Sequence, residues 1–259
     1  MHIQSQASDL KARVPDFLTL GTQKGGTTTL HHLLSQHPQV FLPACKEVHY
    51  FSLHSLRGMA WYADHFRSAR PDQRCGDITP YYLFHPQAPL RIETALPTAR
   101  LLVLLRDPVE RALSHYFHAR RHGFETLPLA EALRAEPDRL QGAEAALAPS
   151  GGHHYSHQKH SYVARGHYEQ QIQAYRQRFP DRQILVLQSE LLFAEPEHCW
   201  QAVLSFLGLD SWPLPPIQAA NRGMGEAHGV ADSVRVQLRR HFADTVAFVS
   251  STYGFDWGW

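Results

Sequence analysis

The sequence has little of what marks a disulfide-bonded, zinc-binding or membrane-spanning protein. Its three cysteines are widely spaced and none belongs to a Cys-x-x-Cys pair, so neither a zinc site nor a disulfide framework is indicated. No apolar run is long enough to cross a bilayer, and residues 1–11 lack the apolar stretch of a signal peptide. These absences favour a cytoplasmic protein with reduced thiols, no membrane span and no bound metal.

An excess of charge of one sign is also absent. The 25 Lys and Arg residues nearly balance the 24 Asp and Glu residues, and the net charge of +1 argues against broad electrostatic binding of a nucleic acid. There is no internal repeat and no linker-like segment. The chain has 259 residues, 43% of them hydrophobic, which is enough for one full core. We expect a loose N-terminal arm at 1–14 and one domain at 15–259.

The most informative segment is an apolar run at 17–20 that ends in a glycine-rich loop and then enters a helix-like stretch. Glycine lets the backbone approach a ligand closely, and the N-terminus of a helix favours an anion. The pattern therefore predicts that a phosphate-like group binds here. The residues expected to hold it are Lys24, Gly25, Gly26, Thr27, Thr28 and Thr29.

The position of the lysine indicates which phosphate-like group the loop is expected to bind. In nucleotide triphosphatases the lysine directly follows the last glycine, and the next hydroxyl holds magnesium. Here Lys24 precedes both glycines. This order resembles the 5′-phosphosulfate loop of sulfotransferases, which bind 3′-phosphoadenosine 5′-phosphosulfate (PAPS). The resemblance implies that Lys24 is catalytic, that it stabilises charge on the bridging oxygen of the donor, and that no metal is required.

A second segment has the composition of a buried parallel strand, at 100–105, followed at once by Arg106, Asp107 and Pro108. Asp107 can cap a helix and Pro108 suits its first position. A strand, Arg-Asp-Pro and a helix that carries a serine resemble the 3′-phosphate site of sulfotransferases. The resemblance implies that Arg106 and Ser114 bind the ribose 3′-phosphate of the donor, and a guanidinium suits a phosphate in geometry and charge.

A third segment, Lys46-Glu47-Val48-His49-Tyr50-Phe51, resembles the Lys-Glu-x-His-[FY]-Phe stretch of heparan-sulfate-type sulfotransferases. In that family the glutamate is the catalytic base, so the resemblance implies that Glu47 takes the proton of the acceptor hydroxyl. His49 is the alternative base, as histidine is in the cytosolic branch of the superfamily. A surface Lys-Glu pair ahead of a buried aromatic strand is the non-catalytic alternative.

The resemblance runs from about residue 15 to the end, apart from 120–160, and it has two departures. Ile78 stands where the family frequently has a lysine, so a cationic contact is expected to be missing. The segment at 221–228 is shorter than the basic loop of the animal enzymes, although Arg222 remains a candidate for the 3′-phosphate site.

The apolar pattern predicts the remaining elements. Strands are predicted near 16–21, 74–78, 100–105 and 183–188. Helices are predicted at 27–36, 58–68, 86–96, from 108 onward, 126–136, 161–178, 196–207 and 231–252. Strands that alternate with helices are typical of a parallel sheet covered on both faces. The predicted fold class is therefore α/β, a single P-loop-type domain with ligands beyond the carboxyl ends of its strands.

The segment at about 137–160 has no clear periodicity and is interpreted as a loop that forms a lid or acceptor-side edge. It holds four histidines, His153, His154, His157 and His160. A metal site is the alternative interpretation, but no carboxylate or cysteine completes a ligand set. An acceptor-gating role is favoured.

Together these features predict transfer of a sulfuryl group from PAPS to a hydroxyl, or less favourably an amine, of a carbohydrate or other small acceptor. One alternative is a P-loop nucleotide kinase or hydrolase in which Asp77 or Asp107 holds magnesium. Another is an inactive nucleotide-binding module. The sequence does not indicate the oligomeric state.

Overall fold

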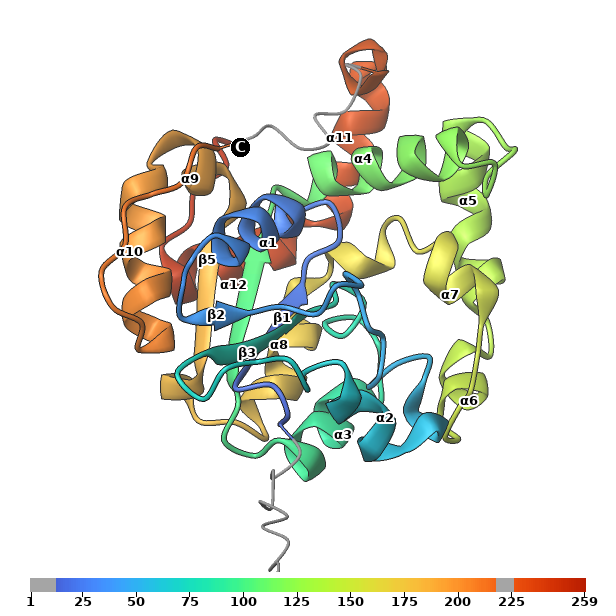
Figure 1. Cartoon of the computed structure of the whole chain (residues 1–259). Helices are drawn as coiled ribbons and strands as arrows, with labels where there is room; N and C mark the ends of the chain where they lie inside the picture. Colours follow the sequence, from blue (N-terminus) through green and yellow to red (C-terminus); the bar gives the residue numbers. More distant parts are fainter. Residues whose placement is uncertain (1–12, 218–225) are drawn as a thin grey trace, which may run out of the picture.

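The computed structural model describes residues 13–217 and 226–259, and its centre is a five-stranded parallel sheet with the strand order β2-β3-β1-β4-β5 (Figure 1). The strands are β1 (Phe17–Gly21), β2 (Val40–Phe41), β3 (Arg74–Ile78), β4 (Arg100–Leu105) and β5 (Ile184–Gln188). The predicted α/β class with a parallel sheet is confirmed. Of the five strands only β2 was not predicted, because two residues are too few to show a period.

Helices cover both faces of the sheet (Figure 1). They are α1 (Thr27–Ser35), α2 (Gly58–Asp64), α3 (Ala88–Ala95), α4 (Pro108–Arg121), α5 (Leu129–Leu140), α6 (Ala143–Leu147), α7 (Tyr155–Lys159), α8 (Tyr168–Arg176), α9 (Ser189–Ala194), α10 (Pro196–Leu207), α11 (Asp232–His241) and α12 (Ala243–Tyr253). Among these described residues, no helix combines the length and the apolar character that a membrane crossing requires.

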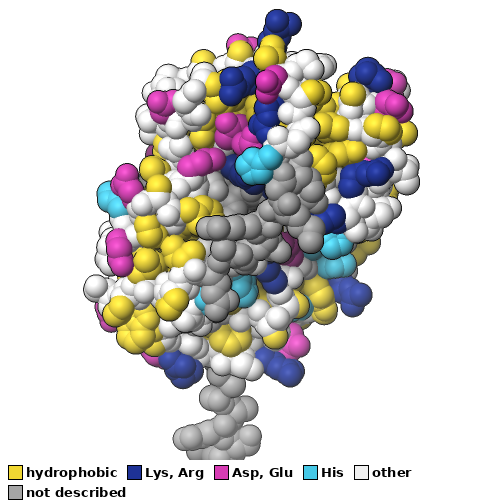
Figure 2. Space-filling model, turned by 90° about the horizontal axis from the view of Figure 1, so that it is seen from above, with side chains coloured by type: hydrophobic (Ala, Val, Ile, Leu, Met, Phe, Trp, Pro, Cys, Tyr) yellow, Lys and Arg dark blue, Asp and Glu magenta, His cyan; other side chains and the backbone are white. Residues whose placement is uncertain are grey.

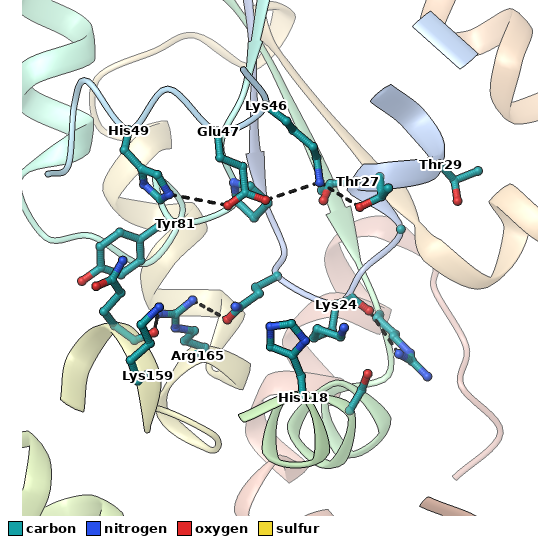
Figure 3. A pocket seen from close by; sticks show the side chains of 17 residues that line it. Lys24, Thr27, Thr29, Lys46, Glu47, His49, Tyr81, His118, Lys159 and Arg165 are labelled. Atoms are coloured by element: carbon teal, nitrogen blue, oxygen red, sulfur yellow. Dashed lines mark hydrogen bonds and ion pairs between the residues drawn. The ribbon is translucent and has the colours of Figure 1, made fainter. Parts of the chain in front are cut away.

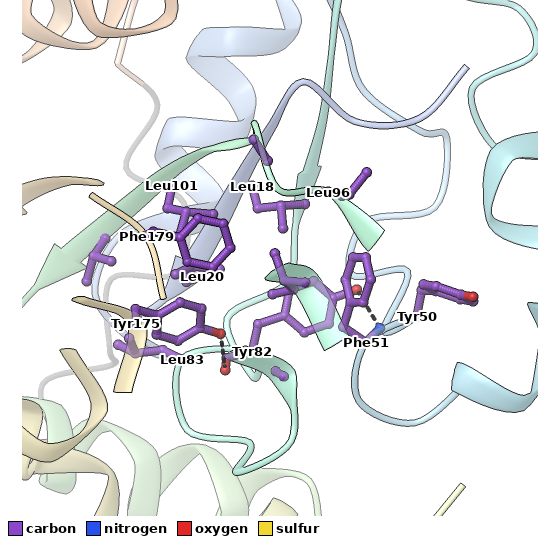
Figure 4. Close-up of a cluster of buried hydrophobic side chains, with 14 of the residues drawn as sticks. Leu18, Leu20, Tyr50, Phe51, Tyr82, Leu83, Leu96, Leu101, Tyr175 and Phe179 are labelled. Atoms are coloured by element: carbon purple, nitrogen blue, oxygen red, sulfur yellow. Dashed lines mark hydrogen bonds between the residues drawn. The ribbon is translucent and has the colours of Figure 1, made fainter. Parts of the chain in front are cut away.

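The sheet separates two hydrophobic clusters because alternate residues of a strand point to opposite faces. In one cluster Leu18 and Leu101 pack with Tyr82, Tyr175 and Phe179 (Figure 4). The other cluster joins α1 and α10 to the opposite face and includes the fully buried Trp200. The central strand β1 is buried along its whole length, which holds the loop that follows it in place.

The helix predicted at 161–178 is wrong in its first half, because the regular helix α8 spans only Tyr168–Arg176. The preceding residues form turns and a short 3₁₀ helix at Ala164–Gly166. There the carboxylate of Glu136 accepts hydrogen bonds from the backbone N–H groups of Val163 and Ala164, at 2.7 and 2.8 Å. The contact with Glu136 therefore satisfies backbone N–H groups that would otherwise form the hydrogen bonds of a longer helix.

The helix predicted at 231–252 is two helices, α11 and α12, which meet at Phe242. Phe242 is fully buried in a cluster with Val109 and Leu113 of α4. The chain bends there so that α11 contacts α4 while α12 contacts α8.

The segment at 137–160 is more regular than the predicted loop, since it contains the end of α5 and two helices of five residues each, α6 and α7. Such short helices leave no readable period in the sequence. Helix α5 begins at Leu129 rather than 126. The carboxylate of Glu125 accepts the backbone N–H groups of Thr126 and Leu127, both at 2.9 Å, and so holds these residues outside the helix.

Candidate active site

A cleft of about 320 Å³ opens beyond the carboxyl ends of the central strands. Figure 2 looks down on this end of the molecule and shows Lys, Arg and His side chains interspersed with Asp and Glu. Nine of the residues that the sequence singled out line the cleft. They are Lys24, Gly26, Thr27, Thr28, Thr29, Glu47, His49, Arg106 and Ser114. Gly25 does not line the cleft, and Arg222 lies outside the described residues.

The loop between β1 and α1 has the geometry of an anion cradle. A Cβ on Gly25 would lie only 2.9 Å from the carbonyl oxygen of Leu104, so only glycine fits between the loop and β4. Gly26 has a φ of 93° and precedes α1, and no side chain caps that helix. The amides of the first turn of α1 are therefore available to an anion in the cleft.

Three non-glycine residues of the described chain have a positive φ, namely Lys24 at 71°, Glu47 at 63° and His49 at 57°. All three line the cleft. This conformation costs free energy for residues with a side chain, and it persists where the surrounding structure imposes it, often at functional sites. The catalytic candidates and the alternative base thus share a backbone feature that sequence alone does not reveal.

Glu47 lies between two potential cations (Figure 3). Its Oε1 atom is 3.3 Å from Nζ of Lys46, and its Oε2 atom is 3.5 Å from Nε2 of His49. Burial by itself would raise the pKa of the Glu47 carboxyl, but the contact with His49 and the charge of Lys46 outweigh it and lower the pKa below its usual value. Glu47 is therefore ionised at neutral pH and able to accept a proton.

Lys46 links this carboxylate to the start of α1. Its Nζ also donates a hydrogen bond of 2.8 Å to Oγ1 of Thr28, at the start of α1. Lys46 was part of the recognised motif but was not assigned a role from the sequence. Ile78, where the family frequently has a lysine, packs in the core with Phe17 and Leu30 and brings no charge to the cleft.

The segment that carries Glu47 and His49 is held in place by hydrogen bonds that lead to a buried carboxylate. Asp77 accepts hydrogen bonds from the hydroxyls of Thr79, Tyr62 and Tyr82 at 2.7, 2.8 and 2.8 Å. Thr79 Oγ1 in turn lies 3.5 Å from the backbone nitrogen of His49, which donates to it. Burial raises the pKa of Asp77. This carboxylate is enclosed by hydroxyls and does not face the cleft.

The carboxylate of Asp107 is likewise occupied by hydrogen bonds within the protein. Its Oδ1 atom accepts the backbone N–H groups of Val109 and Glu110 at 2.7 and 3.1 Å, and so caps α4 as predicted. Its Oδ2 atom accepts the indole N–H of Trp259 at 2.6 Å. The kinase or hydrolase alternative assigned magnesium to Asp77 or Asp107, and the hydrogen bonds of both carboxylates speak against it.

Helix α4 and the turn before it carry the two residues predicted to bind a second phosphate. Arg106, in the turn, donates a hydrogen bond of 3.1 Å to the carbonyl oxygen of Lys24, which ties the turn to the loop between β1 and α1. Ser114 and, one turn later, His118 line the cleft. Burial and the nearby charge of Lys24 lower the pKa of His118 to about 4, so its imidazole is neutral at neutral pH. No sequence motif singled out His118.

Arg165 was also missed, although it lies opposite Glu47 and His49 (Figure 3). Its side chain is almost completely buried, and its guanidinium donates to Oε1 of Gln23 at 2.6 Å and to the carbonyl oxygens of His157 and Gln158 at 3.0 and 2.7 Å. It also lies over the ring of Tyr81. Arg165 thereby joins the loop between β1 and α1 to α7, whose Lys159 lines the cleft.

Two of the four clustered histidines are buried and form hydrogen bonds within the protein. Nδ1 of His157 is 2.8 Å from the hydroxyl of Tyr81, and its ring stacks on Phe84 at 4.1 Å between centroids. His160 contacts the carbonyl oxygen of Phe124 at 2.8 Å. Burial lowers the pKa of His157 to about 2. These imidazoles position α7, which counts against the metal interpretation of this segment.

Known proteins resemble this chain over most of its length. The model of the sulfotransferase domain family matches residues 14–217. A crystal structure of a sulfotransferase from Alicyclobacillus acidocaldarius has 28% sequence identity and a TM-score of 0.78, and the match covers 94% of this chain and 97% of that one.

Two curated proteins match a smaller share. Heparan sulfate glucosamine 3-O-sulfotransferase 3B1 of Homo sapiens is 29% identical over 197 residues, which cover 76% of this chain and 47% of that protein. The membrane-associated sulfotransferase kil1 of Dictyostelium discoideum is 42% identical over 106 residues, which cover 40% of this chain and 22% of that protein. The chain thus spans less than half the length of these curated relatives.

Proposed function

The chain belongs to the sulfotransferase family, and we propose that its cleft transfers a sulfuryl group from PAPS to a hydroxyl of an acceptor. One observation carries the proposal: Lys24, Glu47, Arg106 and Ser114, which come from three separate segments, line the same cleft. A loop that cradles an anion, a guanidinium with a serine, and an ionised carboxylate are what a bisphosphorylated donor and an alcohol acceptor require.

In the proposed reaction the acceptor oxygen attacks sulfur, and the bond between sulfur and the bridging oxygen of the 5′-phosphate breaks. Glu47 takes the proton of the acceptor hydroxyl, and the electron pair of the broken bond stays with 3′,5′-bisphosphoadenosine. Lys24 stabilises the negative charge that develops on that bridging oxygen. Lys46, which contacts both Thr28 and Glu47, lies between the two reacting ends and stabilises the transferring group.

The donor is held at both phosphates. We assign the 5′-phosphosulfate to the loop amides and to the hydroxyls of Thr27, Thr28 and Thr29. Arg106 and Ser114 take the 3′-phosphate, and Arg222 remains a proposed contact. The proposed scheme needs no metal ion. The lysine precedes the glycines of the loop, unlike the order that holds magnesium, and the carboxylates of Asp77 and Asp107 are occupied by hydrogen bonds.

A carbohydrate or small alcohol is the proposed acceptor. The human relative is named as a heparan sulfate glucosamine 3-O-sulfotransferase, and a sugar hydroxyl is proposed here by analogy with it. The acceptor is expected to lie between Glu47 and α7, where Lys159 lines the cleft. The segment at 137–160 is then the acceptor-side wall of one domain at 15–259. A cytoplasmic location remains a prediction from the sequence.

Calorimetry with two nucleotides tests the proposal directly. The protein should bind 3′,5′-bisphosphoadenosine without magnesium and should bind ATP weakly with or without it. Incubation with PAPS and a panel of sugars and alcohols should then add one sulfate mass to an acceptor. Tighter, magnesium-dependent binding of ATP would overturn the proposal in favour of a kinase or hydrolase. Binding of bisphosphoadenosine without turnover on any acceptor would favour the inactive module.

A further inference from the structure

Two carboxylates flank the turn that carries Arg106, and each accepts the indole N–H of a tryptophan. Asp107 is the next residue in the chain, and its Oδ2 atom accepts a hydrogen bond from Nε1 of Trp259 at 2.6 Å. Glu190 in α9 accepts one from Nε1 of Trp257 at 3.0 Å, through its Oε2 atom. Both tryptophans follow α12, in a segment that returns to α9 (Figure 1). The proposed reaction uses neither of them.

The other oxygens of these carboxylates are occupied by backbone N–H groups. Oδ1 of Asp107 accepts two amides of the first turn of α4 at 2.7 and 3.1 Å. Oε1 of Glu190 accepts the amide of Asp107 at 3.0 Å. Among the described residues, Arg106 forms no ion pair with either carboxylate, and its guanidinium donates instead to the carbonyl oxygen of Lys24 at 3.1 Å. The guanidinium therefore remains available to an anion in the cleft.

Tertiary packing fixes where the two indoles lie. Trp259 packs with the cluster between α4 and α11, and Cζ of Arg239 lies 5.4 Å from the centroid of its ring. Trp257 packs against the main core cluster, with its ring 6.5 Å from that of Tyr168. The hydroxyl of Tyr168 in turn donates to the carbonyl oxygen of Arg106 at 2.8 Å. The indoles and the turn are thus parts of one packed unit.

A carboxylate with a free oxygen beside a guanidinium would compete with a phosphate. Both anions bind the same N–H groups of arginine, and the attraction between opposite charges is stronger in a partly enclosed cleft than in water. An indole N–H is a donor without charge. It can occupy a carboxylate oxygen without adding a cation that would attract the donor nucleotide by itself.

On the basis of the proposed function, we infer that Trp257 and Trp259 are positioning residues that act through Arg106. Their indoles hold the carboxylates of Glu190 and Asp107, and so leave the guanidinium of Arg106 to the 3′-phosphate. Selectivity for a nucleotide with a 3′-phosphate then depends on two side chains that do not contact it. Trp259 has the larger effect, because Asp107 is adjacent to Arg106 in the chain.

Calorimetric titration with 3′,5′-bisphosphoadenosine and with AMP tests the inference. Trp259→Phe keeps an aromatic ring and removes the indole N–H. It should lower the preference for the bisphosphate over AMP about fivefold or more, the worth of one hydrogen bond to a charged group, while the Kd of AMP hardly changes. Trp257→Phe should have a smaller effect in the same direction. Trp212→Phe, at a partly exposed tryptophan beside His37, is the matched control and should leave both Kd values unchanged.

A second substitution separates competition for Arg106 from a general loss of structure. Asparagine can replace Asp107 at the start of α4, because its side-chain oxygen also caps a helix but carries no charge. Asp107→Asn combined with Trp259→Phe should therefore bring the preference back to within about twofold of wild type. Urea unfolding shows whether each variant is folded. Trp257→Phe with Glu190→Gln repeats the test at the second carboxylate if Trp259→Phe does not fold.

The outcomes distinguish the inference from the proposed function. An unchanged preference in Trp259→Phe, or a loss that Asp107→Asn does not restore, would overturn the inference while the proposed function stands. If wild type binds neither nucleotide, the proposed function fails and the inference fails with it.

Discussion

The ammonium of Lys46 lies 2.8 Å from the hydroxyl of Thr28 and so joins the segment that carries the proposed base to the first turn of α1. The same Nζ is 3.3 Å from Glu47. One cation therefore contacts both the proposed donor site and the proposed base, an arrangement that stabilises negative charge built up between them.

Replacement of Lys46 should impair the chemical step more than donor binding. We expect Lys46→Met to lower kcat about 100-fold, because the preorganised cation is lost from the position where charge develops. Lys46→Arg should retain part of the rate, since the charge remains. Steady-state kinetics with the Kd of 3′,5′-bisphosphoadenosine measured in parallel check this. A loss confined to the Kd would assign Lys46 to donor binding alone.

Glu47→Gln should lower kcat about 10²- to 10⁴-fold with little change in donor affinity, because the amide cannot take the acceptor proton. The pKa of Glu47 lies below its usual 4.5, so the base should stay ionised as the pH falls and lose its proton-accepting form only below that value. A pH profile of kcat/KM should therefore show no loss from Glu47 between pH 8 and about 5.

A variant of His49, the alternative base, tests which of the two side chains accepts the proton. His49→Asn should reduce kcat less than Glu47→Gln does, because the imidazole contacts Glu47 Oε2 at 3.5 Å and helps to orient it. The reverse ranking of the two variants would make His49 the base.

Arg106→Gln should remove the preference for a nucleotide with a 3′-phosphate. Wild type is expected to bind 3′,5′-bisphosphoadenosine more tightly than AMP, and the variant should lose about tenfold or more of that preference, the worth of a charge-assisted hydrogen bond. The Kd for AMP should hardly change. Arg67→Gln, at an exposed arginine paired with Asp64, serves as the control. An undiminished preference in Arg106→Gln would place the 3′-phosphate elsewhere.

The carboxylate of Glu125 should stabilise the fold in a pH-dependent manner. Burial would raise its pKa, but hydrogen bonds from Arg139, Leu127 and Tyr162 outweigh it and lower the pKa to about 2. A lowered pKa means that this stabilisation is complete above about 4.5, the unfolded value, and is lost as the pH falls toward 2. Glu125→Gln should therefore reduce the free energy of unfolding by about 3 kcal/mol at pH 7 and by less at pH 3.

Urea unfolding at the two pH values measures this difference. Glu93→Gln, which removes one partner of the surface pair with Arg178 at 2.7 Å, should change the free energy of unfolding by less than about 1 kcal/mol at either pH. An equal effect of Glu125→Gln at pH 7 and pH 3 would show that the carboxylate contributes through shape rather than charge.

The sequence by itself determined the parts of this protein that depend on neighbours in the chain. A continuous apolar strand, a glycine-rich turn and a helix start are local patterns, so the proposed donor loop with Lys24 and the turn with Arg106 could be located from the sequence. The helix at 196–207 was predicted with its observed bounds. Glu47 could be proposed only through its motif, since nothing local marks an ionised carboxylate in a cleft.

Only the tertiary structure decided which side chains face one another. Arg165 lies 118 residues from Glu47 in the chain. Its guanidinium donates hydrogen bonds to a side-chain oxygen and to backbone carbonyl oxygens, and no sequence pattern marks these acceptors. His118 and Lys159 also acquire their positions from packing between elements, and α7 is too short to show a period. Burial contributes to the pKa of both Glu47 and His118, and the charge of Lys24, far away in the chain, adds to the shift of His118. Both effects depend on three-dimensional distance, which the order of residues does not encode locally.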